Sequence, residues 1–299
     1  MKIVVGTRGS KLALVQTNWV VEELKKSNPA IEFEVKIIKT KGDLVRHLPL
    51  HKIGDKGLFT KEIEQQLLDK EIDLAIHSMK DMPSMLPKGL KFASVPKRQD
   101  PRDVLVLKEG YSNIDDLPKG AKIGTGSKRR AYQLLKYRPD LAIVPIRGNI
   151  DTRIRKIEEE NLYGVVLAAA GLIRAGLENK ISYFLPTDIM IPAPAQGALA
   201  IEIREDDSFI EDIVSKIKDR ETEIQIAAER GFLTGVNGSC HIPMGAYCEI
   251  KDENIILTGL YGDEEGTKLV IKSLEGNIED ASKLGFELAD NVLKEYNNL

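Results

Sequence analysis

Cysteine, histidine and aromatic side chains are scarce in this chain. Its 299 residues include two cysteines and four histidines, and aromatic residues make up 5%. Two cysteines do not form a disulfide framework, and the scattered Cys and His lack the ligand spacing of a zinc site. No apolar run approaches the roughly 20 residues that span a bilayer, and no secretion signal is recognisable at the start. We therefore expect a cytoplasmic protein without a metal and without a membrane partner.

An excess of positive charge is also missing. The formal net charge is −3, whereas nucleic-acid-binding domains are usually basic and single-strand binders use exposed aromatics. Nucleic acid is therefore not an expected partner. The cations that are present gather at particular turns, a distribution typical of proteins that bind small polyanions.

Short apolar runs alternate with helical periods over the first two thirds of the chain. This alternation predicts α/β domains with largely parallel sheets. The last third changes pattern: residues 244–250, 254–261 and 268–273 predict an antiparallel meander, followed by a final helix. Residues 198–203 predict a strand that returns to the first domain, and residues 41–57 predict a mobile loop, typical of a lid. The expected domains are 1–98 with 198–218 (first α/β lobe), 99–197 (second α/β lobe) and 219–299 (smaller α+β domain).

Cationic turns recur where a predicted strand meets a predicted helix. Segments 7–10 (TRGS), 124–130 (GTGSKRR) and 147–153 (RGNIDTR) have this form, and Arg174 follows a fourth strand. Backbone N–H groups at a helix N-terminus attract anions. Arg129 and Arg130 in a first helical turn oppose the helix dipole, at about 0.3–1 kcal/mol each, unless an anion lies nearby. Each turn alone could be a solvated basic turn; together they predict one cationic cleft beyond the strand ends.

Two further residues are candidates for chemistry. Asp81 in segment 77–83 (HSMKDMP) follows a buried strand; it is either half of a surface pair with Lys80 or an ionised carboxylate that stabilises a cation and moves a proton. Cys240 in segment 238–241 (GSCH) is either an exposed thiol or a small buried hydrophobe. The neighbouring His241 does not predict a dyad, because adjacent residues on an extended chain point to opposite faces. Cys248 alternates with apolar residues and is expected in the core.

Seven motifs occur in an order that resembles the porphobilinogen deaminase (hydroxymethylbilane synthase) family. They are TRGSKLAL from residue 7, KGLF from 56, HSMKDMP from 77, SKRR from 127, RGNIDTR from 147, PAQGAL from 194 and GSCHIP from 238. Any one of them is weak, but the set covers nearly the whole chain. Three positions are unusual for the family pattern: Ala195 stands where Gly is expected, His241 stands where Gln or Glu is common, and Asp151 places a negative charge in the 147–153 turn, at a position that varies.

The resemblance implies a fold, a cofactor and an activity. The family has two lobes similar to type II periplasmic binding proteins and a smaller C-terminal α+β domain. It implies that Cys240 holds a dipyrromethane primer through a thioether, and that Asp81 assists proton transfer and stabilises positive charge on pyrrole nitrogen. Four porphobilinogen units would be joined head to tail on this primer with loss of ammonia, and hydrolysis would release the linear tetrapyrrole hydroxymethylbilane. The protein would be a transferase of haem and other tetrapyrrole biosynthesis.

The resemblance also assigns the groups that hold the acidic pyrroles. Every ring carries an acetate and a propionate, and planar guanidinium groups match such carboxylates. The implied cofactor- and substrate-binding residues are Arg8, Ser10, Lys56, Phe59, Lys80, Thr125, Ser127, Arg129, Arg130, Arg147, Arg153, Arg174 and Gln196. The family pattern implies a monomer. The alternative is a non-catalytic two-lobed protein that binds small anions, because one scaffold serves many functions.

Overall fold

The computed structural model describes residues 1–44, 60–238 and 242–299. The chain divides into two compact units: the first contains Met1–Arg98 and Ala198–Glu223, and the second contains Gln99–Gly197 and Ile224–Leu299. Each unit is described separately below.

The first unit contains a five-stranded sheet in the order β2-β1-β3-β10-β4. Strands β1, β2 and β3 run parallel, while β10 is antiparallel to both β3 and β4. The strands are β1 (Lys2–Arg8), β2 (Glu32–Ile38), β3 (Leu74–Ser78), β4 (Leu90–Phe92) and β10 (Leu199–Arg204). The helices are α1 (Lys11–Ser27), α2 (Lys41–Leu44), α4 (Lys61–Leu68), the 3-10 turn η1 (Met79–Asp81) and α8 (Ser208–Ser215).

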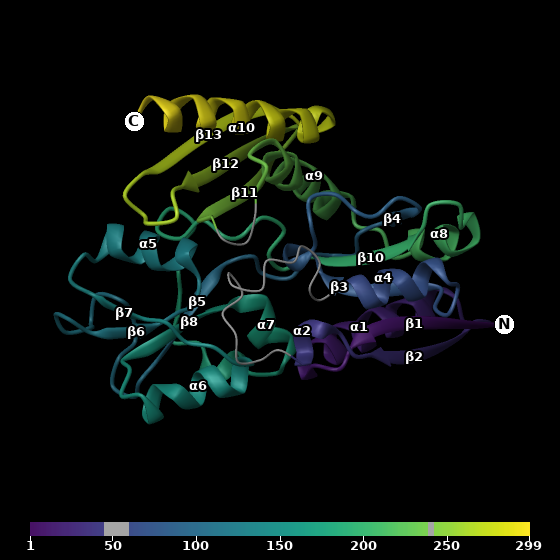
Figure 1. Ribbon diagram of the computed structural model, residues 1–299, viewed down its shortest axis with the longest axis horizontal. Coiled ribbons are helices and arrows are strands. Elements are labelled where there is room, and N and C mark those ends of the chain that lie inside the picture. The colour runs from purple at the N-terminus through teal and green to yellow at the C-terminus, as the bar shows by residue number, and fades with distance from the viewer. Residues whose placement is uncertain (45–59, 239–241) are drawn as a thin grey trace. The chain divides into compact units, whose positions relative to one another are not determined.

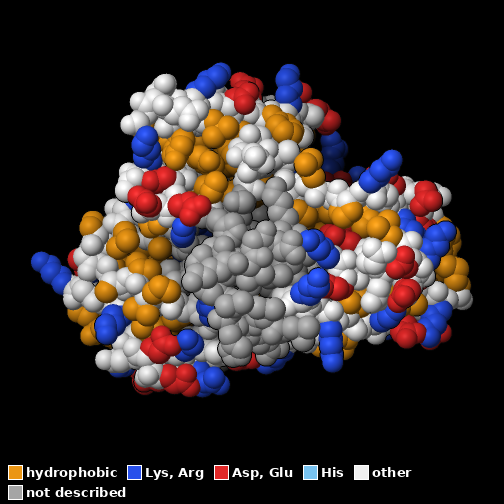
Figure 2. All heavy atoms as spheres, in the orientation of Figure 1, with side chains coloured by type: hydrophobic (Ala, Val, Ile, Leu, Met, Phe, Trp, Pro, Cys, Tyr) orange, Lys and Arg blue, Asp and Glu red, His pale blue; other side chains and the backbone are white. Residues whose placement is uncertain are grey.

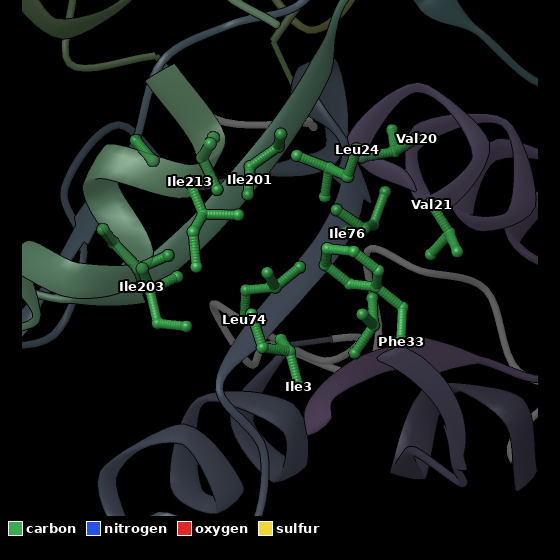
Figure 3. Packing of buried hydrophobic residues seen from close by; sticks show 14 of the residues in the cluster. Ile3, Val20, Val21, Leu24, Phe33, Leu74, Ile76, Ile201, Ile203 and Ile213 are labelled. Carbon is green, nitrogen blue, oxygen red and sulfur yellow. The ribbon is translucent and has the colours of Figure 1, made fainter. Parts of the chain in front are cut away.

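Apolar residues on both faces of this sheet are buried. On one face, side chains of α1 and α8 pack with those of the strands (Figure 3); the labelled ones are Ile3, Val20, Val21, Leu24, Phe33, Leu74, Ile76, Ile201, Ile203 and Ile213. On the other face, Ile63 and Leu67 of α4 pack against Ala75 of β3. Burial of this kind contributes about 25 cal/mol per Å² of apolar surface. The strands are therefore fixed from both sides, which also fixes the turns at their ends.

The second unit contains another five-stranded sheet, in the order β7-β6-β8-β5-β9. Strands β7, β6 and β8 are parallel, and β5 and β9 continue the sheet in antiparallel pairs. The strands are β5 (Asp103–Leu107), β6 (Lys122–Gly124), β7 (Ala142–Val144), β8 (Gly164–Ala168) and β9 (Tyr183–Phe184). The helices are α5 (Lys128–Tyr137), α6 (Ile150–Glu159), α7 (Ala169–Arg174) and the 3-10 turn η2 (Glu178–Lys180).

A three-stranded antiparallel sheet forms the C-terminal part of the second unit. Its strands are β11 (Met244–Lys251), β12 (Asn254–Gly262) and β13 (Leu269–Asn277). Helix α10 (Ala281–Asn298) lies along this sheet (Figure 1), after the 3-10 turn η3 (Ile278–Asp280), and helix α9 (Arg220–Gly235) precedes it. Phe232 of α9 and Leu288 of α10 are fully buried in one cluster with Cys248. The predicted core position of Cys248 is confirmed.

The predicted architecture is largely confirmed, with one correction. Two α/β sheets and a smaller α+β part are present, and the returning strand β10 joins the first sheet. Both α/β sheets are largely parallel, as predicted, with β10 and β5 as the antiparallel strands. Within the predicted loop 41–57, Lys41–Leu44 form α2, and residues 45–57 lie outside the described part. The division into three domains stays a prediction. No helix in the described ranges is both long and apolar enough to span a membrane.

Candidate functional site

Four predicted site residues lie at one edge of the first sheet. Strands β1 and β3 are parallel neighbours, with Gly6 opposite Ala75, so their carboxyl ends meet at the same edge. Arg8 ends β1, and Lys80 and Asp81 follow β3 in the turn η1. Ser10 is the N-cap of α1, and its hydroxyl accepts a hydrogen bond from Ala13 N–H (3.2 Å). The predicted cap is confirmed, and the structure brings this cationic turn beside the Asp81 turn.

The Asp81 turn is held by its neighbours and not by Asp81 itself. The Ser78 hydroxyl donates to Gln16 Oε1 of α1 (3.0 Å), and Met79 N–H donates to the Ala198 carbonyl (3.1 Å). The side chains of Met79 and Met82 are buried, whereas Asp81 is exposed. Because buried groups on both sides fix the turn, the carboxylate is held outward at the sheet edge, accessible to a ligand.

The second sheet presents its cationic turns at one edge in the same way. The parallel strands β6, β7 and β8 end at that edge, and the turn with Thr125 and Ser127, then Arg147 and helix α7, follow them. Thr125 is buried; its N–H donates to the Val144 carbonyl (3.0 Å) and its hydroxyl accepts from Ser127 N–H (3.2 Å). Arg147 is exposed. The predicted placement of these turns at strand ends is confirmed.

Arg153 is tied to the turn that contains Arg147. Its Nε donates to the Gly148 carbonyl (2.7 Å), one residue after Arg147. Gly148 has φ +119, and a Cβ at this position would lie 2.6 Å from a methyl carbon of Thr152. Glycine is therefore required for this close turn, and the hydrogen bond from Arg153 joins the first turn of α6 to it.

Asp103 is the counter-charge of Arg129 and Arg130. Arg129 Nη1 donates to Asp103 Oδ2 (2.7 Å), and Arg130 donates to Asp103 Oδ1 through Nε (3.0 Å) and Nη2 (2.7 Å). All three side chains are buried. Burial opposes ionisation, yet the two guanidinium charges hold the pKa of Asp103 well below its usual range. The unfavourable interaction of Arg129 and Arg130 with the helix dipole is therefore compensated by Asp103, and it does not require an external anion.

Sequence reasoning missed Asp103 as a partner of these arginines. It begins β5, which is antiparallel to β8 and pairs Asp103 with Ala168. Because β5 is antiparallel to β8, its first residue lies at the edge where β8 ends. The sequence pattern does not show that β5 runs in this direction. A buried carboxylate opening an otherwise apolar strand was the available signal.

Gln196 joins the same network from a strained turn. Its Nε2 donates to Asp103 Oδ1 (3.0 Å) and to the Pro101 carbonyl (2.8 Å). The preceding Ala195 has φ +61, a conformation that glycine adopts without strain. This conformation gives a physical reason for the glycine expected there. Glu229 of α9 accepts a hydrogen bond from Ala195 N–H (2.7 Å) and helps to hold the turn.

Arg174 provides a test of whether an acidic ligand fits. Its Nη2 donates to the Gly197 carbonyl (2.8 Å), a neutral acceptor. Burial lowers the pKa of Arg174 to about 10, and no carboxylate among the described residues contributes an opposing shift. A partly desolvated guanidinium gains most from a bound anion. The side chain therefore fits the carboxylate of an acidic cofactor or substrate.

Three predicted site residues lie outside the described part of the chain: Lys56, Phe59 and Cys240. Among the residues that are described, no group of His, Cys, Asp or Glu could hold a metal ion. The described site residues include three groups: the edge with Arg8 and Asp81, the turn shared by Arg147 and Arg153, and the network of Arg129, Arg130 and Gln196 around Asp103.

Mixed α/β sheets with cationic turns at their strand ends define a class of α/β proteins suited to small acidic ligands. Residues 3–212 match the family described as porphobilinogen deaminase, dipyromethane cofactor binding domain, and residues 224–294 match its C-terminal domain. The porphobilinogen deaminase of Clostridioides difficile is 70% identical over 100% of this chain and 99% of its own length. The porphobilinogen deaminase of Clostridium novyi is 61% identical over 99% of this chain and 100% of its own length. The chain belongs to the porphobilinogen deaminase family.

Solved structures with a similar fold are much more distant in sequence. A probable amino-acid ABC transporter extracellular-binding protein from Bacillus subtilis is 14% identical, with a TM-score of 0.43 over 73% of this chain and 90% of its own. The BenM effector binding domain with benzoate is 13% identical, with a TM-score of 0.43 over 72% and 90%. Similarity at this level carries no inference about ligand or activity.

Family membership confirms several expectations. The chain is a transferase with hydroxymethylbilane synthase activity, and its cofactor is dipyrromethane. The fold class is confirmed as α/β with a smaller C-terminal α+β part, and the family models likewise separate a C-terminal domain. The enzyme is therefore favoured over the non-catalytic anion-binding alternative. The residues that perform the reaction stay predictions.

Proposed function

We propose that Asp81 is the catalytic acid–base group for the condensation of porphobilinogen, and that Cys240 is the attachment point of the dipyrromethane. The observation that carries the proposal is the exposed carboxylate of Asp81 on a turn whose flanking residues are buried. A turn fixed by its neighbours holds the carboxylate in one place and leaves its oxygens accessible. Both hydrogen bonding to a pyrrole N–H and removal of a ring proton require this.

Asp81 has two tasks in this reaction. When porphobilinogen loses ammonia, the carbon–nitrogen bond of its aminomethyl group breaks and positive charge develops on the pyrrole nitrogen. The carboxylate of Asp81 accepts a hydrogen bond from that pyrrole N–H and stabilises the charge. After the new carbon–carbon bond forms, the substituted ring carbon releases its proton, for which Asp81 is the base.

The cationic side chains bind and orient the acidic rings. We assign this role to the binding residues that the family pattern implies, among them Arg8, Lys80, Arg147, Arg153 and Arg174. The desolvated guanidinium of Arg174 supports it. Arg129, Arg130 and Gln196 share Asp103, so they would present fixed donors held by a buried carboxylate. When bound, the dipyrromethane supplies the pyrrole carbon to which the first substrate unit is joined.

The role of Cys240 is tested by intact-mass measurement of the purified protein. We expect the wild-type chain to exceed its sequence mass by one dipyrromethane, and Cys240→Ser to show only the mass of its own sequence. Cys248→Ser is the matched control, because Cys248 is fully buried and should leave the adduct in place. An unmodified wild-type chain, or an adduct that persists in Cys240→Ser, would contradict the assignment.

The role of Asp81 is tested by the turnover of Asp81→Ala. The exposed side chain makes little contribution to packing, so the variant should fold and carry the cofactor mass. Loss of a general acid–base group lowers kcat by about 10²–10⁴-fold. Lys88→Ala, a change of an exposed charge in the same unit, should leave kcat unchanged. Near-normal turnover of Asp81→Ala would remove Asp81 from the reaction.

We further propose a cytoplasmic monomer that does not bind nucleic acid, divided into domains 1–98 with 198–218, 99–197 and 219–299. The single cysteine of the described residues is a free thiol, which supports a reducing compartment. Positive and negative side chains are interspersed on the described part of the face in Figure 2, which supports the exclusion of nucleic acid. Light scattering after size-exclusion chromatography tests the monomer, and a dimer mass would contradict it.

A further inference from the structure

A buried cluster of titratable side chains lies in the first unit, directly before the Asp81 turn. His77 is the fourth residue of β3, and Glu202 lies on the neighbouring strand β10, where Ala200 pairs with His77. The distance between His77 Nε2 and Glu202 Oε2 is 3.1 Å. The side chain of Glu202 is fully buried and that of His77 is 5% exposed. Glu64 of α4 is also buried.

The electrostatic environment of Glu64 depends on burial and on its neighbours in this cluster. Burial raises the pKa of Glu64, the Thr60 side chain lowers it, and the neighbouring Glu202 raises it again. Glu202 Oε1 has no hydrogen-bond partner among the described residues. The contact with His77 is therefore the main compensation for burying the Glu202 carboxylate.

An apolar residue would be the stabilising choice at position 202. All six residues of β10 are buried: Leu199, Ile201 and Ile203 face the apolar cluster with α1 and α8, while Ala200 and Arg204 share the opposite face with Glu202. Replacing a buried ion pair with apolar groups of similar volume is often neutral or stabilising. Stability alone thus gives no reason for Glu202, whereas a requirement for one fixed position of the strand end does.

The hydrogen bond fixes the strand end that precedes the proposed catalytic turn. His77 is followed by Ser78, which is bonded to Gln16, and by Met79, whose N–H is bonded to Ala198. His77 adds a contact that is specific in direction, between one ring nitrogen and one carboxylate oxygen. Three successive residues before Asp81 are therefore held: His77 by β10, Ser78 by α1, and Met79 by Ala198, the residue before β10.

We propose that Glu202 is a positioning residue for the reaction: through His77 it holds the end of β3 so that Asp81 presents its carboxylate in one orientation. The inference rests on the proposed catalytic role of Asp81. Glu202 itself is fully buried and does not touch substrate. Its effect should therefore appear in kcat, while the KM for porphobilinogen, set by the cationic turns, changes little.

The decisive variant is Glu202→Met, which fills the same volume and cannot accept a hydrogen bond. We expect it to fold and to carry the dipyrromethane mass. Its Tm should be no lower than that of Asn28→Ala, the matched control described below. Its kcat should fall by about 10- to 100-fold, the effect of a small misplacement of a reacting group. Glu202→Gln keeps an acceptor oxygen for the His77 N–H and should recover most of the turnover.

Asn28→Ala is the matched control. Asn28 is buried in the same unit and ties α1 to the neighbourhood of α8: its Nδ2 donates to the Leu24 carbonyl (3.0 Å), and its Oδ1 accepts from Lys216 Nζ (2.7 Å). It lies outside β3 and the turn η1 that carries Asp81, so this variant should lose stability but keep its kcat.

The outcomes separate this inference from the proposed function. If Asp81→Ala is inactive and Glu202→Met turns over as fast as Asn28→Ala, Glu202 is only structural and the inference is wrong. If Glu202→Gln is as slow as Glu202→Met, the hydrogen bond to His77 does not position the turn, and the inference is wrong as well. If Asp81→Ala itself is fully active, the proposed catalytic role fails first.

Discussion

At the scale of single residues, acidic partners distant in sequence decide whether the arginines of a cationic turn are paired within the protein. Arg129 and Arg130 looked like candidates for an external anion because they stand in the first turn of a helix. Their counter-charge is Asp103, which lies in another strand. Spacing along the chain predicted the location of the arginines, but it could not supply a partner that only the antiparallel pairing of β5 brings near.

Asp103→Asn is expected to destabilise the protein strongly. The substitution leaves two buried guanidinium groups without a carboxylate, and breaking a buried pair in this way costs about 3–5 kcal/mol. The measurement is the free energy of unfolding in urea at neutral pH. Asp140→Asn is the control: Asp140 pairs with Arg138 (2.8 Å) but its side chain is 31% exposed, so the loss should be at most about 1 kcal/mol. Equal losses of unfolding free energy for the two variants would contradict the large contribution expected from the buried pair.

The pH dependence of the Asp103→Asn effect follows from the direction of the pKa shift. The folded protein holds the pKa of Asp103 below that of the unfolded chain, which is about 3.9 for an ordinary Asp. The stabilisation is therefore fully present above that value and is lost as the pH falls toward the folded pKa. The difference in unfolding free energy between wild type and Asp103→Asn should be constant from neutral pH down to about pH 5 and shrink below pH 4. A difference that shrinks between pH 7 and pH 5 would contradict it.

At the scale of elements, strands and helices with a clear hydrophobic period were predictable, and two of the shortest strands were not. The buried strands β1, β3 and β8, the meander β11 to β13 and the final helix were all predicted. Strands β4 and β9, which have three and two residues, were missed because so few residues show no period. The direction of β5 was also beyond reach, because a buried apolar strand has the same sequence pattern in parallel and antiparallel neighbours.

The turn between β12 and β13 packs against helix α5, and one glycine allows this contact. Tyr132 of α5 donates its hydroxyl to the Glu264 carbonyl (2.7 Å), and Lys128 pairs with Glu264 (3.2 Å). Gly266 has φ +75, and a Cβ there would lie 2.5 Å from the Tyr132 ring. The glycine therefore meets two requirements, a left-handed backbone and a close approach.

Gly266→Ala is expected to lower the unfolding free energy more than Gly120→Ala does. Gly120 has the same φ of +75, but nothing lies within 4 Å of a Cβ placed there. Both variants carry the cost of a left-handed alanine, about 1–2 kcal/mol. Only Gly266→Ala adds the overlap with Tyr132, about 1–3 kcal/mol more. Chemical denaturation of the two variants checks this, and equal losses would show that the turn moves away from α5 without penalty.

At the scale of the whole molecule, the polypeptide passes between its two units three times, after Arg98, Gly197 and Glu223. Glu229 follows the third crossing in sequence, and it contacts Ala195, which shortly precedes the second crossing. Glu229 Oε2 accepts from Ala195 N–H (2.7 Å), and Glu229 Oε1 accepts from Cys248 N–H (3.0 Å). One fully buried carboxylate thus joins helix α9 to the turn before the second crossing and to β11 of the C-terminal sheet.

Glu229→Gln should therefore be a disruptive substitution despite its equal size. A glutamine offers one acceptor oxygen, and its NH₂ group would face the second backbone N–H, placing two donors against each other in a buried site. An unsatisfied buried donor costs about 1–3 kcal/mol, which thermal unfolding should detect as a lower Tm. Glu221→Gln on the same helix is the control, since Glu221 is exposed and should change the unfolding free energy by less than about 0.5 kcal/mol. Hydrogen exchange localises the effect: the amides of Ala195 and Cys248 should exchange faster in Glu229→Gln. Unchanged exchange at both would mean that this carboxylate does not tie the linking turn to the C-terminal sheet.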